Sequence, residues 1–240
     1  MLARDRSLMM LAWSGPVGIV LVLLGWMVLA GFLPPPSPDL SAQQVADVWA
    51  DHTNLKRLGM VICVWGGTLY VPFTVAVGVL LRRTEVGDRV LSTAQTALGT
   101  FGTVLFTLNF LILAVVAFRP ARPSEVTQQL HDLGFIMTFS PVAPFTLQYV
   151  VIGVAILRDR SDSPVFPRWV AYANFWVGLL LVPACFIPFF KTGPMAWNGI
   201  LSFWIPVAVF VAWFVVMFWT MRAAVLRTPQ ADGVTTDAAS

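Results

Sequence analysis

Charged residues are scarce in this chain of 240 residues. Asp, Glu, Lys and Arg together make up 11% of it, while hydrophobic residues make up 58%. A soluble domain carries about 25% charged residues, so this chain lacks the charge that would coat a water-exposed globule of its size. The mean hydropathy of +0.78 agrees. The composition therefore predicts an integral membrane protein and excludes a disordered chain.

Cysteine is also scarce, and no charge of one sign is concentrated in one place. The two cysteines, Cys63 and Cys185, are too few for a disulfide scaffold. We expect both to be small buried residues, with a disulfide bond between the second and fifth apolar runs as the alternative. The net charge of +3 is spread over separate loops without a basic stripe. That distribution excludes a nucleic-acid-binding protein.

Long apolar runs are what the sequence has instead. A helix needs about 20 residues to cross roughly 30 Å of hydrocarbon, and six runs are long enough. Their hydrophobicity is continuous rather than alternating, so they predict an all-α fold and not membrane-spanning strands. The predicted spans are Met9 to Phe32, Leu58 to Leu81, Leu91 to Ala117, Leu133 to Leu157, Trp169 to Phe190 and Asn198 to Met221.

The distribution of basic residues predicts the orientation of these spans. The first run is too long for a signal peptide and has no small-x-small cleavage site before Pro34, so we expect it to remain as a span. Ten Lys and Arg residues then lie on the side of the termini and five on the other side. The positive-inside rule places both termini in the cytoplasm, in a bacterial-type inner membrane. The ten are Arg4, Arg6, Arg82, Arg83, Arg89, Arg158, Arg160, Arg168, Arg222 and Arg227; the five are Lys56, Arg57, Arg119, Arg122 and Lys191.

An internal repeat is the most specific pattern in the sequence. The second, fourth and sixth runs each contain Ser/Thr-x-x-x-Pro, at Thr68–Pro72, Ser140–Pro144 and Ser202–Pro206. A proline inside a helix frees the carbonyl group four residues earlier, and in lipid that group must find a partner within the protein. We therefore expect kinked even-numbered helices within three hairpins of the same orientation. The hairpins are 9–81, 91–157 and 169–221, within a single domain over 1–226.

Two segments outside the spans have helical patterns. Residues 40–55 begin with a capping box, Ser41 to Gln44, and place Val45, Val48, Trp49, His52 and Leu55 on one stripe. We expect an amphipathic helix that lies at the outer interface. The segment that starts at Ser124 aligns Val126, Leu130, Leu133 and Met137 in the same way. The last residues, 227–240, are predicted to form a disordered cytoplasmic tail.

None of the predicted spans contains Asp, Glu, Lys, Arg or His. Ion pathways, proton relays and counter-ions use such residues inside the membrane, so a proton-coupled pump and a retinal protein are disfavoured. The polar residues within the spans are expected to join helices through hydrogen bonds. The alternative is a ligand pocket. Its predicted lining is Tyr70, Asn109 and Gln148, with the deep tryptophans Trp65, Trp176 and Trp204.

Two histidine–aspartate pairs are the remaining candidates for chemistry. Asp51–His52 and His131–Asp132 each precede an even-numbered span on the predicted outer face. Histidine titrates near neutrality and a carboxylate can orient it, so the four residues are candidate catalytic groups. They are also possible ligands of a divalent metal ion. The sequence does not identify a cofactor.

These observations support three hypotheses. The first is a multi-pass membrane protein that binds an apolar lipid or isoprenoid-like ligand, or that serves as an accessory subunit of a membrane complex. Its partners would be the bilayer, the apolar molecule and other membrane subunits. The second is a membrane enzyme, a cyclase, an isomerase or a metal-assisted catalyst, that uses His52 and His131 on a lipid-like substrate. The third is facilitated diffusion of a neutral solute, with the proline kinks as hinges.

Overall fold

The computed structural model describes residues 3–84 and 89–227. Within these residues the chain forms helices and no strands, so the predicted all-α fold is confirmed. The tail predicted after Arg227 lies outside the described residues. In chain order, the elements are α1 (Ala3–Leu23), η1 (Leu24–Leu29), α2 (Ala42–Ala50), α3 (Thr53–Thr68), α4 (Tyr70–Leu81), α5 (Arg89–Phe118), α6 (Ser124–Phe139), α7 (Ala143–Arg158), α8 (Arg168–Leu181), η2 (Val182–Phe189), η3 (Ile200–Trp204) and α9 (Ile205–Arg227).

Among the described residues, six helical stretches are long and apolar enough to cross a membrane, which agrees with the predicted number. Helix α5 forms one stretch alone, and each of the others joins two consecutive elements. We number these stretches as spans one to six. They are Asp5–Leu29, Thr53–Leu81, Arg89–Phe118, Ser124–Arg158, Arg168–Phe189 and Ile200–Arg227.

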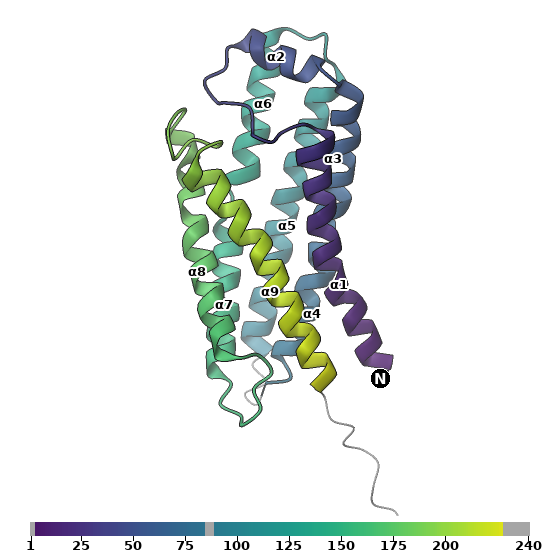
Figure 1. Ribbon diagram of the computed structural model, residues 1–240, viewed down its shortest axis with the longest axis vertical. Coiled ribbons are helices and arrows are strands. Elements are labelled where there is room, and N and C mark those ends of the chain that lie inside the picture. The colour runs from purple at the N-terminus through teal and green to yellow at the C-terminus, as the bar shows by residue number, and fades with distance from the viewer. Residues whose placement is uncertain (1–2, 85–88, 228–240) are drawn as a thin grey trace, which may run out of the picture.

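Consecutive spans pack side by side, and the last packs against the first. Helix α1 packs against α3, α3 against α5, α5 against α6 and α7, α7 against α8, α8 against α9, and α9 against α1. In Figure 1, α1 begins and α9 ends at the lower end of the bundle, while α2 crosses the upper end. We call these the terminal end and the α2 end. The six spans thus form a closed ring around a shared interior.

Glycines allow the first two spans to approach closely. A Cβ atom on Gly18 would lie 2.6 Å from the carbonyl oxygen of Gly66, and one on Gly66 would lie 2.7 Å from that of Gly18. Seven residues along each helix, Gly25 and Gly59 face each other in the same reciprocal way. Small residues at such crossings bring helix backbones into van der Waals contact, which is how helices associate where lipid removes the hydrophobic driving force.

Regular α-helix is interrupted near each Ser/Thr-x-x-x-Pro segment. Leu69 separates α3 from α4 three residues before Pro72, and residues 140–142 separate α6 from α7 just before Pro144. The π-helix η3 changes into α9 immediately before Pro206. Because proline lacks an N–H group and clashes with the preceding turn, these sequence positions favour such breaks.

Helix α2 is capped as the sequence predicts but is shorter. The backbone N–H of Ser41 donates to Gln44 Oε1 at 2.9 Å, and the N–H of Gln44 donates to Ser41 Oγ at 3.4 Å, which completes the capping box. The predicted helix over 40–55 ends at Ala50, because His52 adopts a left-handed conformation with a φ of 45°. The chain then turns into α3. Only part of the predicted stripe is buried as a result: Val45 and Trp49 are buried, whereas His52 and Leu55 are exposed.

Helix α6 begins at Ser124, as predicted, but turns a different face inward. The predicted stripe includes Val126 and Leu133, and both of these side chains are exposed. The buried face instead carries Thr127, His131, Gly134, Phe135 and Phe139. In a membrane the apolar side of a helix can face lipid, so the buried side of α6 is the one with small, polar and aromatic residues.

Candidate functional site

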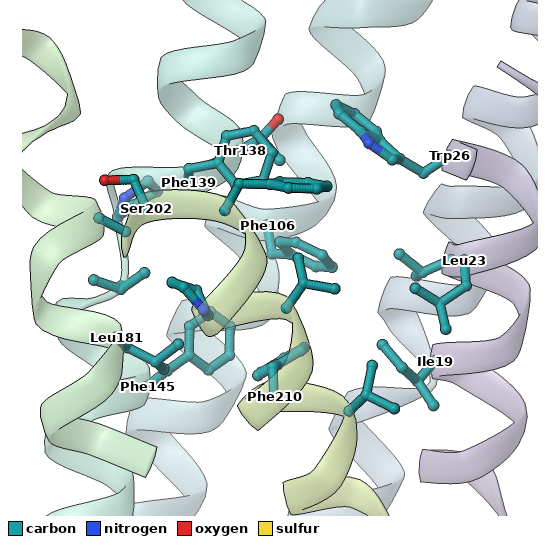
Figure 2. A pocket seen from close by; sticks show the side chains of 18 of the residues that line it. Ile19, Leu23, Trp26, Phe106, Thr138, Phe139, Phe145, Leu181, Ser202 and Phe210 are labelled. Carbon is teal, nitrogen blue, oxygen red and sulfur yellow. The ribbon is translucent and has the colours of Figure 1, made fainter. Parts of the chain in front are cut away.

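A cavity of about 110 Å³ lies inside the ring of helices, between the middle of the spans and the α2 end (Figure 2). Five of the six spans line it; the second span does not. The first span contributes five residues between positions 19 and 27, and the sixth contributes six residues between positions 202 and 211. The remaining lining residues are Phe106, Phe110, Thr138, Phe139, Pro141, Val142, Phe145, Leu181 and Ala184.

The walls of the cavity are almost entirely apolar. The side-chain polar atoms along it belong to Trp26, Thr138 and Ser202. Thr138 donates its hydroxyl proton to the carbonyl oxygen of Gly134 at 2.7 Å, and Ser202 donates to that of Met195 at 2.9 Å. Figure 2 shows both hydroxyl groups directed away from the cavity. The space is therefore suited to hydrocarbon.

The mouth of the cavity lies between the first and sixth spans, within the apolar length of both. Its half-buried lining residues include Leu23 and Met27 on the first span, opposite Val207 and Val211 on α9. Along its length η1 packs against α3 rather than against α9 or η3. The first and sixth spans thus diverge toward the α2 end, after packing together nearer the terminal end. The resulting opening lies between two lipid-facing helices.

The two helices at this mouth have π-helical segments. In η1 the N–H of Ala30 donates to the carbonyl oxygen of Gly25 at 3.0 Å, and in η3 the N–H of Trp204 donates to that of Gly199 at 3.5 Å. A π-turn widens the helix, and such segments frequently occur at functional sites. Here they lie on the two sides of the cavity mouth, since η1 supplies Trp26 and η3 supplies Phe203 to the lining.

Two loops and an aromatic cluster cover the cavity at the α2 end. Trp197 Nε1–H donates to the carbonyl oxygen of Pro36 at 2.7 Å, and Asn198 Nδ2 donates to Ser37 Oγ at 3.3 Å. These bonds join the loop after η1 to the loop before η3. Beneath them, aromatic rings pack with centroids 5.1 to 5.5 Å apart, which separates the cavity from the aqueous side. The rings are Trp26, Phe32, Trp49, Phe135, Phe139, Trp197 and Phe203.

Of the predicted pocket residues, Tyr70 and Gln148 are buried in an interhelical network rather than in the main cavity. Tyr70 donates its hydroxyl proton to Gln148 Oε1 at 2.7 Å, and Gln148 Nε2 donates to Thr74 Oγ1 at 2.7 Å and Gln95 Oε1 at 3.3 Å. Thr74 also donates to Gln95 Oε1 at 3.0 Å. The network joins α4, α5 and α7. Tyr70 lines a second cavity of about 10 Å³, which shares Phe106 and Phe145 with the larger one.

The other predicted pocket residues lie away from both cavities. Asn109 is fully buried in α5, and neither polar atom of its side chain has a hydrogen-bond partner among the described residues. Trp65, Trp176 and Trp204 are 70%, 62% and 43% exposed. These three rings face outward, where they can contact lipid, because an aromatic ring is as compatible with the bilayer as with a protein interior.

The structure places the two predicted histidine–aspartate pairs in different environments. His52 and Asp51 have side chains that are 72% and 70% exposed, with His52 Nε2 3.5 Å from Asp51 Oδ1. His131 is 1% exposed. Its Nδ1 accepts a hydrogen bond from Trp49 Nε1–H at 3.0 Å, so Nδ1 carries no proton. Its Nε2 has no partner among the described residues.

No set of three or more His, Cys, Asp or Glu side chains comes together in the described part of the chain. His52 in particular lies on the surface while His131 lies among the rings of Trp49, Phe135 and Trp197. The two cysteines are free thiols: Cys63 is buried and Cys185 is half-buried. The two histidines therefore do not share a site.

None of the residues that line the main cavity was predicted as a site residue, although the repeat segments contain some of them. Pro141, Val142 and Phe145 belong to the second Ser/Thr-x-x-x-Pro segment or follow it directly. Ser202 and Pro206 belong to the third. Two of the three segments marked in the sequence as kinks therefore also lie in the walls of the cavity. For Trp26, nothing in the sequence distinguished an inward ring from an outward one.

Comparison with known proteins gives no match to this chain among family models, curated proteins or solved structures. The fold defines the class of protein, a six-span α-helical membrane protein.

Proposed function

We propose that this protein binds an apolar, lipid-like molecule in the cavity between its spans, and that the molecule enters from the bilayer. The supporting observation is the position of the mouth, which lies between two membrane-spanning helices and is lined by apolar side chains on both sides. A ligand that entered from water would have to cross the loops and rings at the α2 end. A ligand dissolved in the membrane reaches the mouth directly.

The size of the cavity indicates how much of the ligand it holds. An engineered apolar cavity of about 150 Å³ in another protein stays dry and binds benzene. A cavity of about 110 Å³ has room for a comparable part of a ligand, one ring or a short length of acyl or isoprenoid chain. The rest of the ligand would extend through the mouth into the bilayer. This geometry suits a long hydrocarbon chain better than a compact solute.

A pair of matched substitutions tests this function. Ala184 is a buried residue of the cavity wall, so Ala184→Phe fills the space, whereas Ala208→Phe adds the same ring to the lipid-facing side of α9. The protein in nanodiscs would be irradiated with a phosphatidylcholine that carries a diazirine in its acyl chain, and labelled peptides identified by mass spectrometry. We expect labelling of cavity residues such as Phe139 and Phe203 that falls severalfold in Ala184→Phe only. Labelling confined to outward-facing residues in the wild type would refute the function.

Orientation is part of the same proposal. We infer that the terminal end faces the cytoplasm of a bacterial-type inner membrane, since the ten basic residues of the termini and their loops lie there. The cavity then lies in the outer half of the bilayer. Labelling with a membrane-impermeant maleimide in intact cells tests this: a cysteine introduced by Asp39→Cys should react, and one introduced by Ser161→Cys should react only after lysis.

The three-hairpin repeat and the catalytic role of the histidines stay predictions. The similar interruptions before Pro72, Pro144 and Pro206 support the repeat. For the enzyme hypothesis, the separate environments of His52 and His131 supply no shared site, so binding is the function that we put forward.

A further inference from the structure

The cavity contains one buried donor that the protein leaves unused. Trp26 is 5% exposed and lines the cavity, and its Nε1–H has no hydrogen-bond partner among the described residues. Figure 2 shows its ring at the upper rim on the side of the first span, with the nitrogen on the edge toward the cavity. A buried N–H without a partner is costly and uncommon in native proteins, so this group calls for an acceptor.

The surroundings of Trp26 cannot provide that acceptor. Four phenylalanine rings pack around the indole with centroid distances of 5.1 to 6.0 Å: Phe32, Phe110, Phe135 and Phe139. These contacts fix the position of the ring and offer no lone pair. The donor is therefore held in a defined place by an apolar shell, which is how binding sites orient one polar atom of an otherwise apolar ligand.

The remaining polar groups restrict the ligand further. Thr138 and Ser202 use their hydroxyl protons on backbone carbonyl groups, so neither adds a second free donor to the cavity. No charged side chain lines the cavity within the described residues. A carboxylate or a phosphate would thus be buried here without a counter-charge, which is strongly unfavourable. A neutral oxygen with a free lone pair has no such penalty.

We infer that the cavity selects apolar molecules that carry an uncharged carbonyl oxygen, as in a ketone, an ester or a quinone, and that Trp26 Nε1–H donates to this oxygen. The inference rests on the proposed function and makes it more specific. Trp26 is then a specificity-determining residue, and the hydrocarbon part of the ligand occupies the space toward Phe106 and Phe145. A plain hydrocarbon would fit but would leave the N–H unpaired.

The test compares two probes that differ only in whether they carry a carbonyl oxygen. The first is a methyl ketone with an octyl chain, and the second is the alkene in which CH₂ replaces the carbonyl oxygen. Binding to the protein in nanodiscs would be measured by displacement of the diazirine lipid from the cavity, against the probe concentration in the bilayer. We expect the wild type to prefer the ketone by about fivefold, the factor that one hydrogen bond of ordinary net strength gives.

Two tryptophan substitutions supply the comparison. Trp26→Phe keeps an aromatic ring but removes the donor, so the ketone and the alkene should bind equally. Trp204→Phe changes an exposed ring of η3 and should keep the roughly fivefold preference. If Trp26→Phe does not fold, the wild type still decides: with isotope-labelled tryptophan, one of the ten indole N–H resonances should move downfield with the ketone and not with the alkene.

The outcomes separate the two proposals. Equal affinity of the wild type for both probes, with no shifted indole resonance, would overturn the role of Trp26 and leave the proposed function standing. Failure of both probes to displace the lipid would overturn the proposed function and this inference with it.

Discussion

Replacing Gln148 by methionine would measure the strength of the polar network that joins three spans. Gln148 is fully buried in α7 and makes three side-chain hydrogen bonds, to Tyr70 and Thr74 of α4 and to Gln95 of α5. Methionine has a similar unbranched shape and can form none of them at comparable strength. The substitution therefore removes the bonds with little change of volume.

The expected loss follows from these contacts. Interhelical hydrogen bonds in membranes contribute about 0.6 kcal/mol each on average, so the three bonds account for about 2 kcal/mol. The hydroxyl of Tyr70 also loses its acceptor in a fully buried place, which adds about 1–2 kcal/mol. We expect Gln148→Met to lower the free energy of unfolding by about 3–4 kcal/mol. Leu147→Met, on the exposed side of the same helix, should change it by less than about 0.5 kcal/mol.

The assay is unfolding by sodium dodecyl sulfate in mixed micelles, followed by circular dichroism. A double-mutant cycle with Tyr70→Phe isolates the bond between the two side chains, because the double variant no longer contains an unpaired hydroxyl. A coupling energy of about 0.6–1.7 kcal/mol is expected. Additive effects of Tyr70→Phe and Gln148→Met, or a loss no larger than that of Leu147→Met, would refute the idea that this network stabilises the bundle.

Two further predictions concern the contacts between neighbouring spans. Gly59→Ala places a methyl group against the backbone of Gly25 and should lower the free energy of unfolding by about 1–3 kcal/mol in the same assay. Gly178→Ala should be tolerated, because the added Cβ would lie 3.5 Å from its nearest atom. Equal losses in the two variants would contradict the close glycine packing. Trp213→Phe removes the N–H group that donates to Asn174 Oδ1 at 2.9 Å, and the loss of this hydrogen bond should lower the free energy of unfolding by about 1 kcal/mol. This loss should be smaller when Trp213→Phe is combined with Asn174→Leu.

The number of spans could be predicted because the bilayer imposes it. Only a continuous apolar run of sufficient length can cross hydrocarbon as a helix, and each such run in the sequence is a helical stretch in the structure. Local signals were also reliable where one interaction decides the outcome. The capping box at Ser41 formed as predicted.

The inward faces of the helices could not be predicted in the same way. In a soluble protein an apolar stripe marks the core, but lipid tails are as apolar as leucine, so hydrophobicity does not distinguish the two sides of a membrane helix. On α6 this reversed the prediction, since Val126 and Leu133 face outward while Thr127 and His131 are buried. The same ambiguity explains why Trp65 was expected inside although its ring is exposed.

The location of the cavity follows from the interrupted helices. Straight helices in a closed ring can pack along their whole length, and side chains then fill the interior. Here the fourth span is broken at residues 140–142 and the sixth begins as a π-helix before Pro206, so two of the spans that line the cavity lose regular geometry beside it. The π-helix η1 interrupts the regular α-helical geometry of the first span in a similar way. The backbone positions that the proline segments disturb are thus the positions where packing leaves about 110 Å³ unfilled. An empty cavity of this size would destabilise the fold by about 2–3 kcal/mol. Its persistence in a sequence that could fill it at Ala184 supports the proposal that a molecule from the bilayer occupies it.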